Sequence, residues 1–176
     1  MGDWSTAIAR QGKFATNLAE LLLKGISPAT FARKPDIGGR VIDTNHPAFV
    51  FGHLSLYPFG ALTMLGLDAT KAPKPAGFDD LFAAGKECRD DPAGTIYPPM
   101  DTIVSAFRAN TAALLAAIPA VNDSLLREPN PREGRFREMC PTIGEAVAFY
   151  TSAHVMMHMG QISAWRRCFG LGSAMG

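Results

Sequence analysis

Cysteine is scarce in this sequence, and its few occurrences lie far apart. Cys88, Cys140 and Cys168 are the three cysteines of the chain. No two of them form the Cys-x-x-Cys pair that is typical of zinc sites and redox motifs. An odd number of distant thiols also provides no disulfide framework. These absences favour a reducing, cytoplasmic environment.

Long runs of one residue class are missing as well. Gly, Pro or a charged residue interrupts each apolar stretch, so we expect no membrane span, and the first residues lack the apolar core of a secretory signal. The formal net charge is +1 and no block of a single sign occurs, so nucleic acid is not an expected partner. A hydrophobic share of 47% over 176 residues predicts a single globular domain spanning residues 1–176.

Several familiar catalytic patterns are also absent. The sequence has no glycine-rich phosphate loop, no nucleophile elbow and no acid pair with glycosidase-like spacing. No alternating pattern typical of a β-strand stands out. Any catalytic chemistry would then come from side chains carried on helices.

The sequence does contain four segments with apolar residues at helical spacing. They span residues 4–24, 45–64, 99–118 and 142–169. Long connections, rich in Pro, Gly and charged residues, separate them. This pattern predicts an all-α protein, an antiparallel four-helix bundle with long crossover connections.

Individual residues predict how these helices begin, bend and pack. Asn45 is a suitable N-cap for the second helix, and Pro58 predicts a kink inside it. Thr142 and Glu145 predict a capping box at the start of the fourth. The apolar stripe of the first helix includes Phe14, which we therefore expect to face the core.

All four histidines lie on stripes that face the predicted core. His154 and His158 are one turn apart on the fourth helix, a spacing at which two imidazoles can bind one ion. His53 lies on the apolar stripe of the second helix and can face them across the bundle, whereas His46 lies two turns away and is assigned to a rim or a cap. Three neutral imidazoles would leave a coordination position for water or substrate. The alternative, that these are ordinary buried core residues, stays open on the residue pattern alone.

Three further side chains are candidates for catalytic roles. Tyr57 follows His53 by one turn, Tyr150 precedes His154 by one turn, and Gln161 follows His158 by about one turn. The tyrosines could donate or orient a proton at an open coordination position, and the glutamine could orient a ligand. Core packing of the tyrosines and an interhelical hydrogen bond from the glutamine are the alternatives. The arginines between residues 127 and 137 could hold an anion or lie in solvent.

Two motifs resemble those of a known family. The segment NHPAFVFGHLSLY, residues 45–57, resembles the part of DinB-like proteins in which an Asn opens a helix and a Gly-His pair carries a metal ligand. HVMMHMGQISAWRR, residues 154–167, resembles the closing His-x-x-x-His-x-Gly-Gln motif of the same superfamily. Shorter similarities lie between these two motifs, in LFAAG, YPPMDTI and PTIGEA, and they occur in the same order as in the family. The resemblance therefore spans nearly the whole chain.

The resemblance implies a fold, a metal and a class of chemistry. The family fold is an antiparallel four-helix bundle with one long crossover, and its ligand positions correspond to His53, His154 and His158. A divalent transition metal is implied, with zinc expected first and nickel, iron or manganese as alternatives. Some family members use a low-molecular-weight thiol, such as bacillithiol or mycothiol, in metal-dependent transfer or isomerisation. Such a thiol and a small-molecule substrate are therefore the expected partners, and a homodimer is a further expectation.

Two functional hypotheses remain at this point. The first is a metal-dependent enzyme, either an S-transferase or isomerase that uses a thiol or a hydrolase, acting on a small electrophile. The second is a non-catalytic, stress-related bundle that binds a metal or a small molecule. A bundle whose site has lost its function is a third hypothesis.

Overall fold

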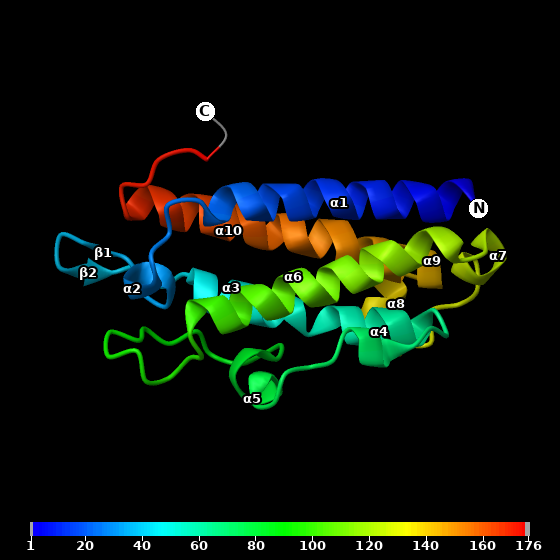
Figure 1. Cartoon of the computed structure of the whole chain (residues 1–176), viewed down its shortest axis with the longest axis horizontal. Helices are drawn as coiled ribbons and strands as arrows, with labels where there is room; N and C mark the ends of the chain where they lie inside the picture. The colour runs from blue at the N-terminus through cyan, green and yellow to red at the C-terminus, as the bar shows by residue number, and fades with distance from the viewer. Residues whose placement is uncertain (1, 175–176) are drawn as a thin grey trace.

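The computed structural model describes residues 2–174, and its long elements are all helices. Figure 1 shows these helices grouped into four rods that lie side by side along the long axis. The rods are α1 (Asp3–Leu23), α3 (Pro47–Ser55) with α4 (Tyr57–Met64), α6 (Met100–Ala117), and α9 (Ile143–Ala148) with α10 (His154–Cys168). The predicted all-α class is therefore confirmed.

The directions of the rods follow from one long connection. After α4 the chain returns along the molecule before α6 begins, so α3–α4 and α6 run one way while α1 and α9–α10 run the other (Figure 1). The helix α3 packs on α6, and α1 packs on α10, as parallel neighbours. Antiparallel contacts join α1 to α6 and α3 to α10. Neighbouring rods are therefore not all antiparallel, because the crossover makes two consecutive rods point the same way.

The connections carry short elements. These are α2 (Pro28–Phe31), β1 (Asp36–Ile37), β2 (Arg40–Val41), η1 (Ala69–Lys71), α5 (Phe78–Phe82), η2 (Ile118–Ala120), α7 (Asp123–Leu126) and α8 (Arg135–Met139). The two strands form a small antiparallel hairpin that the sequence analysis did not predict. Its turn residues Gly38 and Gly39 have φ values of 64° and 84°, which only glycine adopts without strain.

Most of the predicted helix boundaries are present, with one correction. The break expected at Pro58 separates α3 from α4, and this proline lies in the first turn of α4, where its missing N–H does not interrupt the helix. The capping box of Thr142 and Glu145 is present. The cap of α3 is His46 rather than Asn45, because the His46 Nδ1 atom accepts a hydrogen bond from the Phe49 amide at 3.2 Å.

The fourth rod contains a π-helical turn that the sequence analysis missed. The segment η3 (Phe149–Ala153) separates α9 from α10 without bending the rod away from the bundle. The Thr151 hydroxyl donates to the Val147 carbonyl at 2.9 Å, and the Ser152 hydroxyl donates to the Ala148 carbonyl at 2.7 Å. A π turn holds one extra residue, so it changes which side chains of α10 face inward.

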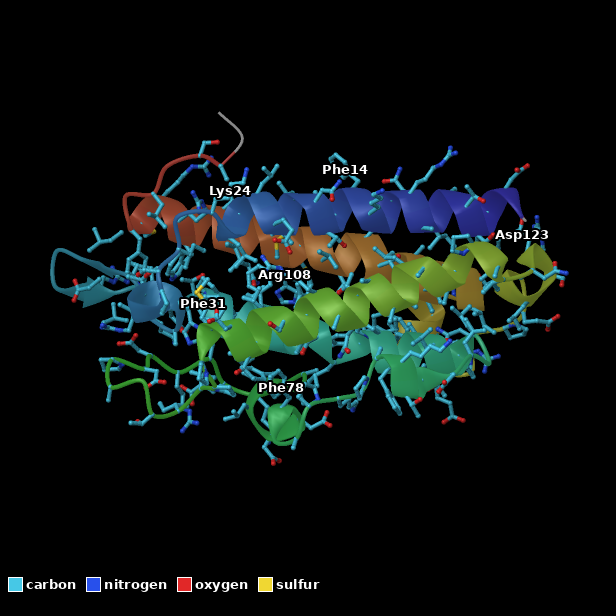
Figure 2. The ribbon with its side chains drawn as sticks, in the orientation of Figure 1. Phe14, Lys24, Phe31, Phe78, Arg108 and Asp123 are labelled. Atoms are coloured by element: carbon cyan, nitrogen blue, oxygen red, sulfur yellow. The ribbon has the colours of Figure 1, made fainter. Side chains whose placement is uncertain are left out.

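Helix α1 packs through its smallest residues. Gly12, Ala15 and Ala19 are buried, whereas Phe14 is 63% exposed and points away from the bundle (Figure 2). A Cβ atom on Gly12 would lie 2.4 Å from the Leu115 side chain, so the close approach of α1 to its neighbours requires glycine there. The expectation that Phe14 faces the core is therefore wrong, because the buried face runs through Ile8, these three small residues and Leu22, and Phe14 lies outside it.

Helix α6 continues into η2, and together they form an apolar stretch, Met100–Ala120. Within residues 2–174 this is the one stretch that is long and apolar enough to span a membrane by length and composition alone. Its position accounts for that composition, because α6 packs against α1, α3 and α4. Length and composition of a core helix are weak evidence for a membrane span.

Candidate metal centre

Helices α3 and α10 bring His53, His154 and His158 together. The Nε2 atom of His154 lies 3.2 Å from Nε2 of His53 and 3.1 Å from Nε2 of His158. The possible ligand atoms of all three lie within 4.8 Å of one another. Tetrahedral bonds of about 2.0–2.1 Å from zinc to nitrogen place ligand nitrogens about 3.3 Å apart. The observed spacing therefore suits a small divalent ion.

Hydrogen bonds on the outer nitrogens fix two of the three rings. The Nδ1–H group of His53 donates to the Phe82 carbonyl at 2.7 Å. The Nδ1–H group of His158 donates to the Gln161 side-chain oxygen at 2.9 Å, and the Asn45 amide donates to that same oxygen at 3.2 Å. A proton on Nδ1 leaves the lone pair on Nε2, so both rings present a metal-binding atom to the centre.

Burial keeps the three imidazoles uncharged. His53, His154 and His158 are 7%, 5% and 6% exposed. Burial lowers the pKa of His53 to about 4, and burial together with the neighbouring imidazoles lowers the pKa of His154 to about 3. Burial also lowers the pKa of His158. At neutral pH all three are in the unprotonated form that binds metals.

His154 is held differently from the other two. Its Nδ1 atom is buried and has no hydrogen-bond partner among the described residues. Its ring instead stacks on Phe149 of η3, with ring centres 5.3 Å apart and planes 15° apart. Packing against the π turn therefore orients this imidazole. A divalent cation would accept the lone pairs of all three Nε2 atoms at once, so the donor set fits a metal.

Tyr57 lies beside the three histidines. Its hydroxyl oxygen is 3.1 Å from Nε2 of His53, and burial raises the pKa of Tyr57 to about 12. The hydroxyl therefore stays protonated and can donate a hydrogen bond towards the centre. The Tyr150 ring lies 5.0 Å from the Tyr57 ring, and burial raises its pKa as well. Both predicted tyrosines thus border the site, with Tyr57 at hydrogen-bond distance.

The three histidines face a cavity of about 610 Å³. The chain segment after α5 forms part of its wall, and the α7–α8 connection, α8 and η3 form others. The lining residues are Asn45, Phe49, His53, Tyr57, Ala83, Ala84, Gly85, Lys86, Arg132, Phe136, Phe149, Tyr150, His154, Met157 and His158. The site is therefore accessible to a small molecule, unlike a closed structural metal site.

Sequence reasoning located the three histidines, Tyr57, Tyr150 and Gln161, but missed two partners. Asn45 was assigned to a helix cap, yet its amide holds Gln161. The available signal for this role was the position of Asn45, eight residues before His53 and beside the start of a helix. The Phe82 carbonyl left no signal, because every residue has one. His46 lies outside the site, where its Nε2–H donates to the Arg89 carbonyl at 2.8 Å.

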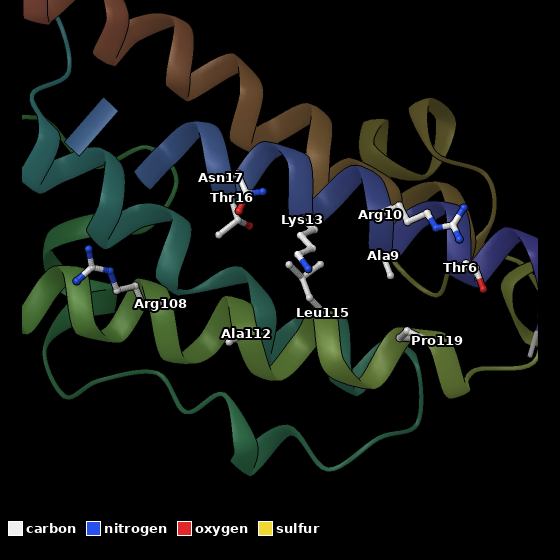
Figure 3. Close-up of a pocket in the computed structure, with 10 residues that line it drawn as sticks. All are labelled: Thr6, Ala9, Arg10, Lys13, Thr16, Asn17, Arg108, Ala112, Leu115 and Pro119. Atoms are coloured by element: carbon white, nitrogen blue, oxygen red, sulfur yellow. The ribbon is translucent and has the colours of Figure 1, made fainter. Parts of the chain in front are cut away.

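A second cavity, of about 520 Å³, lies between α1 and α6 (Figure 3). Arg10, Lys13 and Arg108 are the charged residues of its wall, and Arg108 pairs with Glu20 at 2.6 Å. Among the described residues, no histidine, cysteine or carboxylate lines it. This cavity therefore lacks a donor set for a metal.

Comparisons with known proteins give one match. The family model described as the DinB superfamily matches residues 11–162. This range includes the three histidines and all four rods, apart from the first residues of α1 and the last residues of α10. No curated protein and no solved structure matches the chain.

Proposed function

This chain belongs to the DinB superfamily, and we propose that it is a metal-dependent enzyme that acts on a small electrophile. One observation carries the proposal: three uncharged imidazole nitrogens converge at an accessible cavity. The proposed ligands are His53, His154 and His158, with one coordination position left for an exchangeable ligand. We also propose that the helices form the four-helix bundle of the family, which has a single long crossover connection.

The metal is proposed to be zinc, with nickel, iron or manganese as alternatives. A metal bound here would lower the pKa of a coordinated thiol or water, which supplies a nucleophile at neutral pH. A low-molecular-weight thiol is the proposed co-substrate, in an S-transfer or isomerisation reaction.

The protein's own residues would position the reactants. Gln161 and Asn45 hold the His158 ring, and the Phe82 carbonyl holds the His53 ring. The Tyr57 hydroxyl, protonated at neutral pH, would donate a hydrogen bond to an anionic atom near His53. Aromatic residues of α8 and η3 line the cavity and would provide an apolar surface for the reactants.

One observation favours a second candidate, a non-catalytic metal- or small-molecule-binding protein connected with stress. Apart from the three histidines, the described lining contains no carboxylate and no imidazole that could act as a general base. A protein that only stores or senses a metal does not need such a group.

Metal analysis of native protein, purified without chelators, tests the proposal first. We expect about one transition-metal ion per chain and a large loss of metal affinity in His154→Ala. Thiol-transfer assays with bacillithiol, mycothiol and glutathione on a chromogenic electrophile then separate the candidates. Transfer that requires the metal supports the enzyme. Stoichiometric metal without transfer supports the binding protein, and absence of metal with unchanged affinity in His154→Ala rejects both the metal-dependent enzyme and the metal-binding protein.

A further inference from the structure

The cavity facing the histidines has charge of one sign. Lys86 and Arg132 are the charged residues of its wall, and no Asp or Glu lines it among the described residues. The neutral imidazoles add no charge of their own. An anion entering this cavity would therefore meet two cations and no competing carboxylate.

Arg132 occupies a defined place in this wall. It also lines an adjoining cavity of about 360 Å³, which shares Tyr57 and Tyr150 with the first and whose one carboxylate, Asp79, is paired with Lys74. A Cβ atom on Gly60 would lie 3.1 Å from a guanidinium nitrogen of Arg132, so this glycine leaves room for the guanidinium against α4. The positive charge also opposes the rise in the pKa of both tyrosines. Arg132 therefore lies beside the phenols that border the site.

The backbone that carries Arg132 is anchored. Its amide donates to the Asn130 side-chain oxygen at 3.0 Å. Asn130 is fully buried, and its side-chain amide donates to the Cys140 carbonyl at 2.8 Å. The segment between α7 and α8 thus holds the arginine at the cavity by a buried amide.

Within residues 2–174, neither cation has an anionic partner, and both side chains are exposed. Arg33, Arg108 and Lys74, by contrast, pair with Asp90, Glu20 and Asp79. The side chains of Arg132 and Lys86 make no ion pair or hydrogen bond with any described residue. Their charges remain available to a ligand.

We propose that the ligand of this cavity carries a carboxylate, which Arg132 binds and Lys86 attracts, while the rest of the molecule extends to the three histidines. A planar guanidinium matches a carboxylate with two parallel hydrogen bonds. The inference rests on the proposed function for the reactive end of the ligand. The carboxylate site itself requires only the cavity and its two cations.

Two probes of equal size test the proposal, 3-mercaptopropionate and its neutral amide, 3-mercaptopropionamide. Their binding to the cobalt-loaded protein is followed by the visible absorption of the cobalt site. We expect the acid to bind roughly fivefold to tenfold more tightly than the amide at low salt. Arg132→Gln should abolish this preference and Lys86→Gln should reduce it. Arg135→Gln, an exposed arginine of the same region that does not line the cavity, should leave it unchanged.

A second measurement separates this proposal from the metal. In metal-free protein, 3-mercaptopropionate should shift the side-chain Nε–H NMR signal that is lost in Arg132→Gln, and the amide should not. If no metal binds, the proposed function fails while this measurement still decides the carboxylate site. Equal binding of acid and amide in both forms, or an equal preference in Arg132→Gln and Arg135→Gln, overturns the carboxylate proposal alone.

Discussion

At the scale of residues, a pair of amides supports one candidate ligand. The Gln161 side-chain oxygen accepts a hydrogen bond from the Nδ1–H group of His158, and the Asn45 amide donates a hydrogen bond to that same oxygen. In Gln161→Leu the ring would lose the acceptor that fixes its orientation and tautomer, so zinc affinity should fall by about 10-fold to 100-fold. Competition with a chromophoric chelator measures this change. Gln11→Leu, on the exposed side of α1, is the matched control, and an equal effect of both variants would contradict the role given to Gln161.

The two kinds of buried histidine provide a second test. His154→Ala removes one of three convergent nitrogens and should reduce zinc affinity by more than about 100-fold, beyond the effect of losing a supporting hydrogen bond. His46→Gln removes an imidazole that is just as deeply buried but lies outside the site, where it caps α3 and donates to the Arg89 carbonyl. Its zinc affinity should stay within about twofold of the wild type while its stability falls by about 1 kcal/mol. Chelator competition and urea unfolding measure the two effects, and the opposite ranking of affinities would contradict the site.

Sequence reasoning works at this scale where a side chain carries its own chemistry. The spacing of His154 and His158 predicts a shared face from helical geometry alone. The place of His53 on the apolar stripe of the second helix then indicated it as their partner, and the resemblance indicated the same residue. The acceptor for the His53 ring, by contrast, is the backbone of Phe82, and its position depends on how the long connection folds. Nothing in the identity of Phe82 encodes that contact.

At the scale of elements, both irregularities in the rods occur at the site. The break between α3 and α4 comes three residues after His53, and η3 ends at the residue before His154. The π turn was invisible in the sequence because its residues are compatible with an ordinary helix, and only the packing of α9 and α10 on both sides requires the extra residue. Irregular backbone at such positions is a common feature of functional sites.

Deleting Ser152 tests the role of the π turn. Removal of the one extra residue should convert η3 into a regular α-helix that leaves the orientation of α10 relative to α9 nearly unchanged, because the π turn already accommodates that residue. His154 and His158 should then stay at the cavity, and zinc affinity should stay within about tenfold of the wild type. Ser152→Ala keeps the residue count and removes only the hydroxyl bonded to Ala148, so its affinity should be unchanged. Loss of the site in the deletion variant would contradict the interpretation of η3 as a turn that accommodates one extra residue.

At the scale of the whole molecule, the crossover decides which surfaces meet. The sequence predicted the four rods from their periodicity, but a periodic stripe does not specify the direction of a neighbour. The buried apolar residues form two clusters, and the crossover decides which helices contribute to each. One cluster gathers residues of α3, α5 and α10, and the other gathers residues of α4 and α9. The histidines lie where these clusters meet, which explains how uncharged imidazoles come to be buried near a cavity.

The buried histidines also give the whole molecule a defined response to acid. Burial lowers the pKa of His46 and His53 to about 4, and that of His154 to about 3, whereas the unfolded chain takes up these protons near pH 6.5. Between about pH 6.5 and 4 the unfolded state therefore binds more protons than the folded state, and the free energy of unfolding of metal-free protein should fall as the pH falls. Urea unfolding across this range measures the slope, which His46→Gln should reduce.

Zinc binding should counteract this loss of stability. The pH at which zinc no longer stabilises the fold tests the pKa of its ligands. At a free zinc concentration one hundred times the dissociation constant, binding to the folded state adds about 2.7 kcal/mol. Because burial lowers the pKa of His53 to about 4, that of His154 to about 3, and that of His158 below its usual range, the increase in melting temperature caused by zinc should persist at pH 5. Imidazoles with an ordinary pKa would be largely protonated at that pH and would release the metal. Thermal unfolding with zinc and with a chelator at pH 7 and pH 5 makes the comparison, and an increase seen only at pH 7 would contradict the buried, uncharged state of the three histidines.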